Sequence, residues 1–256
     1  MNSTSSIAQP RSTFDWLGNV LALLATIAVN ALANSLPLAG VTTGEVSALY
    51  PSLFTPAGHT FAIWSLIYIA VTAFVVYQAL PPQRSNALLA NISIWFKVSC
   101  IANCVWIVLW HYQLIPLTLL MMLLLLASLV VIYQRVHAVS KPASPRERWL
   151  LYVPFSLYLG WISVATIANV SAVQTALALN DAGLSAVVWT VLKLVLAGLL
   201  AAVVNRRYSD GVYALVFVWA AVGIATAQAA NTVVLLTALA LAGYCLVLAV
   251  SAFRAS

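Results

Sequence analysis

The sequence predicts an all-α fold, a polytopic membrane bundle of about eight transmembrane helices. Of the 256 residues, 64% are hydrophobic and 6% are charged, whereas about a quarter of an ordinary soluble domain is charged. Apolar runs recur along the chain, and each approaches the roughly 20 residues that a helix needs to cross a bilayer. The runs lack the period-two alternation of a membrane β-barrel. Helices are therefore the structures that satisfy the backbone polar groups in lipid.

Eight apolar segments can be placed in order, with polar or proline-containing joints between them. The polar tail at residues 1–13 lacks the pattern of a cleaved signal, so we expect the first segment to be retained and to direct insertion. We divide the chain into this tail, a five-helix core at 14–175 and a three-helix extension at 176–256. The eight segments cover residues 14–36, 59–80, 91–112, 114–135, 149–172, 185–204, 211–230 and 231–251.

The basic residues support this order of segments. If the N-terminus is cytoplasmic, nine of the 11 Lys and Arg residues fall on the cytoplasmic side and none on the opposite side, as the positive-inside rule requires. We therefore expect an integral protein of the cell (inner) membrane with both termini in the cytoplasm. The net charge of +6 then serves topology, so the expected partner is the lipid bilayer and not nucleic acid. The nine residues are Arg11, Arg84, Arg135, Lys141, Arg146, Arg148, Arg206, Arg207 and Arg254.

The longest joint outside the membrane, residues 37–58, is both broken and apolar. Its prolines and glycines stop regular helix and favour turns. It nevertheless contains Leu49, Tyr50, Leu53 and Phe54, which a solvated linker does not require. Such a segment either folds back over the mouth of the bundle as a lid or rests at headgroup level as an interfacial anchor. Composition alone leaves both arrangements open.

Several tryptophans fall deep within the predicted helices rather than at their ends. At 1.5 Å per residue, Trp64 lies roughly 8 Å inside the outer end of its helix and Trp106 roughly 9 Å inside the outer end of its own. Trp161 reaches the outer half of the segment at 149–172. Three helices therefore offer indole rings at a common depth, beneath the joint at 37–58.

Two amides accompany these rings. Asn103 lies one turn below Trp106, and Asn169 shares a face with Trp161 and Ala165 at a spacing of four. Polar groups in hydrocarbon need partners, so both amides should face protein or a cavity. The pattern indicates either a ligand pocket of aromatic and small residues with few orienting polar groups, or a well-packed aromatic core in which the amides join helices.

Three stretches resemble the TspO/MBR family, the tryptophan-rich sensory proteins related to the translocator protein. FTPAGHTFAIWSLIY at 54–68 resembles the family's Phe-x-Pro-Pro loop and second helix, and NCVWIVLW at 103–110 resembles its third-helix Asn-x-x-Trp element. YLGWISVATIAN at 158–169 resembles its fifth-helix signature and is the most specific of the three. The stretches occur in the family's order and place the resemblance over about residues 14–172.

The resemblance implies a five-helix bundle, often dimeric, that binds tetrapyrroles, sterol-like or other hydrophobic ligands in a pocket under the first loop. Relatives have been suggested to promote breakdown of bound porphyrin, and Trp64 or Trp161 would serve such a role here. Carried over residue by residue, the resemblance implies a ligand-binding set of Phe54, Pro56, Phe61, Trp64, Tyr68, Asn103, Trp106, Tyr158, Trp161, Ala165 and Asn169.

The sequence departs from the family's pattern at particular positions. Ala57 replaces the second proline of the loop, and Leu157 replaces the proline before the fifth-helix tyrosine. The spacing from Phe61 to Trp64 is one residue short. The three helices beyond residue 184 have no counterpart in five-helix members.

Lys193 lies near the middle of the segment at 185–204 and is the remaining binding candidate, because an intramembrane lysine is by default a functional hypothesis. It could pair with a ligand carboxylate, such as a porphyrin propionate, or with Glu45 of the joint at 37–58. The alternative is a lysine that extends to the membrane surface or loses its charge on burial.

The sequence contains no carboxylate pair at one depth, no nucleophile triad and no metal-ligand spacing. We therefore expect no enzyme, no catalytic residue, no metal and no cofactor apart from a tetrapyrrole bound as ligand. His59 and His111 lie near the outer surface and are conceivable haem ligands, although interfacial histidines are commonly solvated. The predicted function is binding of a hydrophobic or tetrapyrrole-like molecule with a sensory or regulatory role. The alternatives are a transporter or channel for a small hydrophobic or acidic solute that uses Lys193 and the extra helices, and a structural subunit of another complex.

Overall fold

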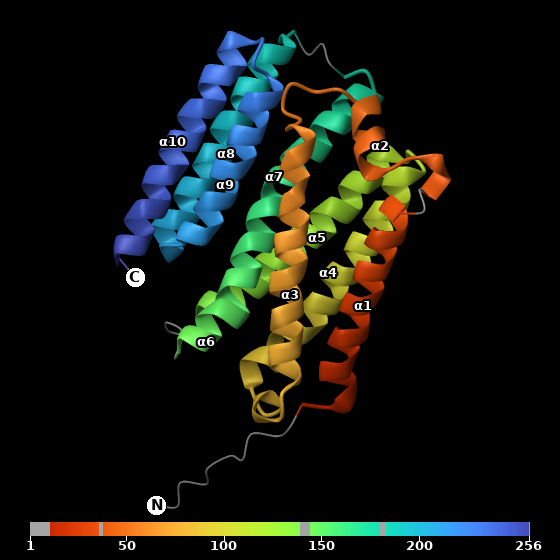
Figure 1. The fold of residues 1–256 in the computed structure, drawn as a ribbon, viewed down its shortest axis with the longest axis vertical. Helices are drawn as coiled ribbons and strands as arrows, with labels where there is room; N and C mark the ends of the chain where they lie inside the picture. The colour runs from red at the N-terminus through yellow and green to blue at the C-terminus, as the bar shows by residue number, and fades with distance from the viewer. Residues whose placement is uncertain (1–10, 36–37, 139–143, 180–182, 256) are drawn as a thin grey trace, which may run out of the picture.

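A computed structural model describes residues 11–35, 38–138, 144–179 and 183–255, and every regular element in these ranges is helical (Figure 1). The predicted all-α membrane bundle is therefore confirmed. Within the described ranges, seven helical stretches are long and apolar enough to span a bilayer. The principal helices are α1 (Thr13–Ser35), α3 (Ile63–Ala79), α4 (Ala87–His111), α5 (Ile115–Ala138), α7 (Val153–Ala176), α8 (Ala186–Tyr208) and α10 (Thr232–Ala255).

The eighth apolar helix, α9 (Gly211–Ala227), is shorter than its predicted segment. Its 17 residues span about 25 Å at 1.5 Å per residue, somewhat less than the hydrocarbon core. The helix packs against α7, α8 and α10, and its alanine-rich buried face allows this close approach. Each of the eight predicted segments thus corresponds to one helix of the bundle.

Short elements fill the joints. The 3-10 turns are η1 (Leu38–Gly40), η2 (Gly58–Ala62), which leads directly into α3, and η3 (Pro81–Gln83). The short helix α6 (Pro145–Glu147) and the π-helical turn η4 (Arg148–Tyr152) lead into α7. The joint at 37–58, for which a lid and an interfacial anchor were both left open, contains the helix α2 (Thr43–Leu49). Thr42 caps α2, because its hydroxyl accepts from the Glu45 backbone N–H at 3.3 Å while its own N–H donates to the Glu45 carboxylate at 2.6 Å.

The helices form two groups that stand side by side (Figure 1). One group contains α1, α3, α4, α5 and α7, and the other contains α8, α9 and α10, which contact the first mainly through α9 and α7. Three phenylalanines pack edge to face in the first group, where the ring of Phe74 lies 4.8 Å from that of Phe155 and 5.3 Å from that of Phe96. This geometry is the favoured arrangement of aromatic quadrupoles.

A buried carboxylate joins the two groups at one end. Asp210 caps α9 by accepting from the Tyr213 N–H at 2.9 Å. Its other oxygen accepts from the Tyr133 hydroxyl of α5 at 2.8 Å and from the Ser156 hydroxyl of α7 at 2.5 Å. A buried charge is tolerated where several donors surround it. Asp210 therefore fixes the C-terminal helices against the core.

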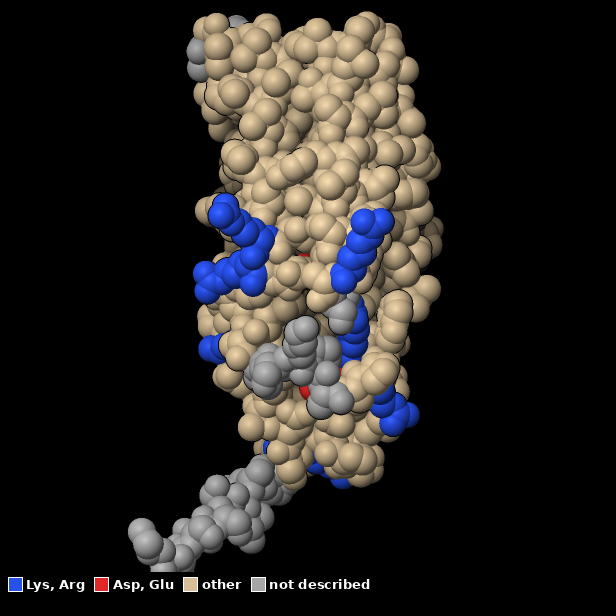
Figure 2. All heavy atoms as spheres, turned by 90° about the vertical axis from the view of Figure 1, so that its left-hand side faces the viewer, with Lys and Arg blue, Asp and Glu red and all other residues tan. Residues whose placement is uncertain are grey.

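Charged side chains are concentrated toward one end of the molecule. On the face shown in Figure 2, Lys and Arg occupy the lower part and leave the upper part free. At that lower end, Arg11 donates to Asp15 at 2.7 Å, and the ammonium of Lys97 reaches the Ser93 hydroxyl at 3.1 Å. Lys97 therefore extends along its helix toward the basic end. Lys141, one of the residues counted for topology, lies outside the described ranges.

Candidate functional site

The lid helix α2 lies across the upper end of the first helix group (Figure 1). Its buried residue Val46 packs with Trp110, Ile115 and Ala172 from α4, α5 and α7. The indole N–H of Trp110 also donates to the Thr43 carbonyl oxygen at 3.1 Å. The segment therefore folds back over the bundle mouth, which is the first of the two arrangements expected from its composition.

The segment after α2 is held by the C-terminal helices. The Ala57 N–H donates to the Gly223 carbonyl oxygen at 3.0 Å, and the indole N–H of Trp219 donates to the Thr60 carbonyl oxygen at 2.8 Å. Gly223 is required at this contact, since a Cβ atom there would lie 2.1 Å from the Thr60 hydroxyl oxygen. The roof of the bundle is thus bonded to α9.

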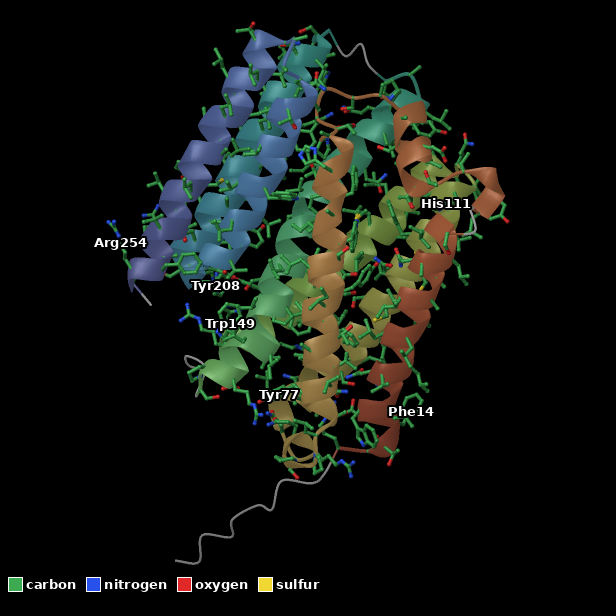
Figure 3. The ribbon with its side chains drawn as sticks, in the orientation of Figure 1. Phe14, Tyr77, His111, Trp149, Tyr208 and Arg254 are labelled. Carbon is green, nitrogen blue, oxygen red and sulfur yellow. The ribbon has the colours of Figure 1, made fainter. Side chains whose placement is uncertain are left out.

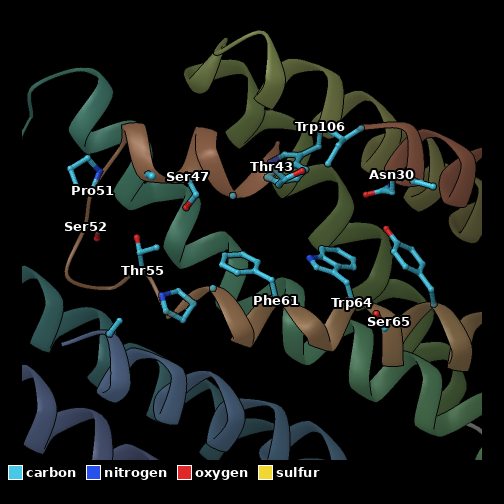
Figure 4. Close-up of a pocket in the computed structure, with 18 of the residues that line it drawn as sticks. Asn30, Thr43, Ser47, Pro51, Ser52, Thr55, Phe61, Trp64, Ser65 and Trp106 are labelled. Atoms are coloured by element: carbon cyan, nitrogen blue, oxygen red, sulfur yellow. The ribbon is translucent and has the colours of Figure 1, made fainter. Parts of the chain in front are cut away.

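A cavity of about 770 Å³ lies beneath α2. Figure 4 shows Phe61 and Trp64 pointing from η2 and α3 toward Trp106 of α4 and Thr43 of α2, with Asn30 of α1 at the edge. Such a volume lies within the range of small-molecule sites, roughly 300–1,000 Å³. The polar groups that line the cavity are neutral: Asn30, Thr43, Ser47, Ser52, Thr55, Ser65, Tyr68 and Gln228.

A second, deeper hollow of about 80 Å³ adjoins the first and shares Phe61, Trp64 and Trp106 with it. Its remaining wall comes mainly from α7. The α7 residues that line it are Trp161, Val164, Ala165, Ala168, Asn169 and Ala172. Small side chains on this face of α7 leave the space that the indole rings enclose.

The aromatic rings contact one another in a defined geometry. Trp64 stacks on Tyr68 with ring centroids 5.5 Å apart, and its edge-to-face contact with Trp161 places those centroids 6.3 Å apart. Phe61 meets Trp161 at 5.9 Å, nearly perpendicular. Contacts of this kind hold rings in place beyond what area burial provides. The cavity wall is consequently formed by rings that support one another.

The two predicted amides join helices. Asn103 accepts from the Asn30 amide at 2.7 Å and donates to the Tyr158 hydroxyl at 3.3 Å. Asn169 accepts from the indole N–H of Trp106 at 3.1 Å and donates to the Thr118 hydroxyl at 2.8 Å. Asn169 therefore orients a ring of the cavity wall, because its hydrogen bond fixes the indole of Trp106.

The structure brings most of the predicted site residues together. Pro56, Phe61, Trp64, Tyr68 and Trp106 line the wide cavity, and Trp161, Ala165 and Asn169 line the deeper hollow. The other predicted residues line neither. Tyr158 and Asn103 contact lining residues from behind, and Phe54 is buried in the core.

Lys193 lies apart from both hollows. Its ammonium donates to the Ser171 hydroxyl at 2.7 Å and to the Gln174 side-chain oxygen at 2.6 Å, both on α7. Glu45, the carboxylate considered as its partner, is engaged at the cap of α2. Lys193 therefore joins α8 to α7 in this structure.

Some lining residues were not predicted from the sequence. Thr43 and Ser47 come from α2, whose helical character is hidden within a proline-rich joint. Asn30 could have been found, because a lone amide within an apolar helix indicates an inward-facing position. Gln228 carries no such signal, since its place at the cavity follows from the contact between α9 and η2.

The fold and the site define a polytopic helical membrane protein with an aromatic cavity at the end of its bundle opposite the cluster of Lys and Arg. A family model described as TSPO-like protein matches residues 15–251. The chain therefore belongs to the TSPO-like protein family. The match continues through α8 and α9 and into α10, so α8, α9 and most of α10 lie within the matched length. Comparison with curated proteins and with solved structures finds no match.

Proposed function

We propose that this protein binds a hydrophobic small molecule in the cavity beneath α2 and has a sensory or regulatory role. The observation that carries the proposal is a cavity of about 770 Å³ whose wall holds Phe61, Trp64, Tyr68 and Trp106. Aromatic faces bind flat apolar ligands by stacking and by removing apolar area from water, at about 25 cal/mol per Å². A tetrapyrrole or a sterol-like molecule, both implied by the family resemblance, has this chemistry.

A regulatory role is supported by the way the roof is held. A ligand under α2 touches the same segment that bonds to α9 through Gly223 and Trp219. Ligand binding that favours one position of the roof would bias the C-terminal helices as well, because a ligand shifts an equilibrium by its differential affinity for the two states. The extra helices would then carry the signal, and a partner protein would read it.

Binding is favoured over transport and over catalysis. The transport alternative relied on Lys193, which is bonded to α7 and lines neither hollow. The polar side chains that line the cavity carry amides, hydroxyls and indole N–H groups, and none of them is a carboxylate suited to acid or base chemistry. Breakdown of a bound porphyrin, implied by the resemblance, would depend on Trp64 or Trp161. We propose no resident cofactor and no metal for the site.

The charge distribution supports an orientation. The basic residues gather at the end opposite the cavity, which we place in the cytoplasm with both termini. The cavity then opens on the non-cytoplasmic side of a cell membrane. A homodimer remains an expectation from the family resemblance.

Quenching of intrinsic tryptophan emission tests the proposal. Purified protein in detergent is titrated with protoporphyrin IX and, separately, with a fluorescent sterol. Saturable quenching is expected, with the saturating component lost in Trp64→Phe and retained in the control Trp149→Phe, because Trp149 is exposed on η4, far from the cavity. Figure 3 shows Trp149 toward the basic end of the molecule. Linear quenching that is the same in all three proteins would overturn the proposal.

A further inference from the structure

Two hydrogen-bond donors at the aromatic cavity are buried without a hydrogen-bond partner among the described residues. They are the hydroxyl of Tyr68 and the indole N–H of Trp161. Tyr68 lines the wide cavity and Trp161, 2% exposed, lines the deeper hollow. The great majority of buried polar groups are satisfied, so an unpaired donor in a native fold needs an explanation.

These two donors stand on either side of one ring. Trp64 stacks on Tyr68 at 5.5 Å and meets Trp161 edge to face at 6.3 Å. Two other indole N–H groups in the same cluster do have hydrogen-bond acceptors. The indole N–H of Trp106 donates to the Asn169 side-chain oxygen, and that of Trp110 donates to the Thr43 carbonyl oxygen. Within this aromatic cluster the unpaired donors therefore lie on the two rings that contact Trp64. The other buried side-chain atoms without a partner among the described residues, on Thr60, Trp189 and Asn205, belong to residues that line neither hollow.

The cavity also excludes charge. None of the residues that line either hollow is Lys, Arg, Asp, Glu or His. Lys193, the intramembrane cation on this half of α8, is bonded to Ser171 and Gln174. A ligand carboxylate would therefore lose its hydration in the cavity without forming an ion pair. Desolvation of an unpaired charge makes the free energy of binding less favourable.

We infer that the site selects a neutral apolar ligand that carries a hydrogen-bond acceptor oxygen, such as a ketone, ester or ether. The acceptor is bound by the Tyr68 hydroxyl or the Trp161 N–H, while the hydrocarbon part of the ligand stacks on Trp64. This inference rests on the proposed function and deepens it, because it names the class of ligand. Anionic groups of a larger ligand would have to project out of the cavity.

A different explanation of the unpaired donors is a contact with a ring face. The Trp161 ring is nearly perpendicular to those of Phe61 and Trp64, and an N–H group over an aromatic face gains a weak interaction. That explanation predicts that the donors contribute nothing to ligand selectivity. The test below distinguishes the two.

The test uses three probes of one shape: pyrene, 1-acetylpyrene and 1-pyrenecarboxylate. They share the aromatic hydrocarbon and differ in having no acceptor, a neutral acceptor or an anion. Affinities are measured by the probes' own fluorescence with the full-length protein in detergent. We expect 1-acetylpyrene to bind about fivefold more tightly than pyrene, as one hydrogen bond allows, and 1-pyrenecarboxylate to bind most weakly.

Two variants remove the donors. Tyr68→Phe deletes one oxygen and keeps the ring. If the Tyr68 hydroxyl binds the acceptor, the ratio of the affinities for 1-acetylpyrene and pyrene should fall to about one in this variant. If the Trp161 N–H binds it, the ratio should fall to about one in Trp161→Phe instead. Tyr158→Phe is the matched control, since its hydroxyl already accepts from Asn103 and it lines neither hollow. The preference should be unchanged in this control, and comparable pyrene affinity across the proteins shows that the variants fold.

The outcomes separate this inference from the proposed function. Saturable pyrene binding with no preference for 1-acetylpyrene, or with tightest binding of the anion, overturns the inference and leaves the apolar site standing. A preference that survives in both Tyr68→Phe and Trp161→Phe also overturns it. The absence of saturable binding for all three probes overturns the proposed function together with the inference.

Discussion

The indole nitrogen of Trp219, on α9, donates a 2.8 Å hydrogen bond to the carbonyl oxygen of Thr60, in the turn that begins α3. A second bond joins the same two segments: the Ala57 N–H, three residues before Thr60, donates at 3.0 Å to the carbonyl oxygen of Gly223, four residues after Trp219. These bonds join the C-terminal helices to the roof of the aromatic cavity. The C-terminal helices therefore do more than lengthen the bundle, because α9 holds the roof of the cavity in place.

Gly223→Ala should disturb this joint. The added Cβ would lie 2.1 Å from the Thr60 hydroxyl oxygen and 2.7 Å from its methyl carbon, so η2 must shift. Overpacking of this kind costs about 1–3 kcal/mol of stability. We expect a lower Tm in detergent and weaker binding of 1-acetylpyrene. Gly243→Ala is the matched control, since no atom lies within 4 Å of a Cβ placed there. If Gly223→Ala and Gly243→Ala both keep the wild-type Tm and the wild-type affinity for 1-acetylpyrene, the contact between α9 and η2 does not support the cavity.

Asp210→Asn should loosen the opposite end of the same interface. The carboxylate accepts three hydrogen bonds, from Tyr213, Tyr133 and Ser156. An amide has one acceptor oxygen, so at least one of the buried donors loses its acceptor, at a cost of about 1–3 kcal/mol or more. Thermal unfolding measures the loss. Tyr133→Phe, which removes a donor and leaves the other two bonds, should cost less, and equal stability of Asp210→Asn and wild type would show that the carboxylate does not hold the two groups together.

Hydropathy and charge predicted the bundle well because they report the constraints that the bilayer imposes. Long apolar runs follow directly from the cost of polar groups in lipid, and basic residues gathered toward one end are typical of the positive-inside rule. The cavity was predicted less completely. Counting residues placed Trp64, Trp106 and Trp161 at a common depth. The size of the cavity, however, depends on the distance between α2 and these three rings. That distance is set by contacts between distant segments, such as Ala57 with Gly223, which periodicity does not reveal.

Lys193 illustrates the same limit. Its depth in an apolar helix identified it as unusual, yet depth does not give the direction in which a side chain points. The partners are Ser171 and Gln174, one helix away on α7. Asn169 was placed correctly by its spacing from Trp161, because four residues along a helix return to one face. Its bond to Trp106 required knowledge of which helices are neighbours.

Lys193→Met should leave ligand binding unchanged. The ammonium lines neither hollow and bonds α7, so its removal takes no group from the cavity. Titration with protoporphyrin IX, which carries two carboxylates, is the sensitive measurement. We expect an affinity within about twofold of wild type and a modest loss of stability from two lost hydrogen bonds, about 1–3 kcal/mol. A loss of affinity confined to the acidic ligand would instead assign Lys193 to a ligand carboxylate.

The cap of α2 should weaken in acid. Hydrogen bonds from the Thr42 backbone N–H and then its hydroxyl hold the pKa of Glu45 below its ordinary value of 4.5. A carboxylate whose pKa is lowered by folding stabilises the folded lid above its unfolded pKa, and this contribution is lost as the pH falls through the folded pKa. Backbone protection of residues 43–49 in hydrogen exchange should therefore decrease below about pH 4.5 relative to that of α4.

Glu45→Gln separates this cap from other effects of acid. Glutamine retains an acceptor oxygen but has no charge to lose, so protection of α2 should start lower and become independent of pH in the same range. The protein's other carboxylate caps, such as Asp210 at α9, are untouched by the change. If wild type and Glu45→Gln lose protection of α2 in parallel as the pH falls, the pH dependence lies elsewhere and the capping box does not govern how the lid closes over the cavity.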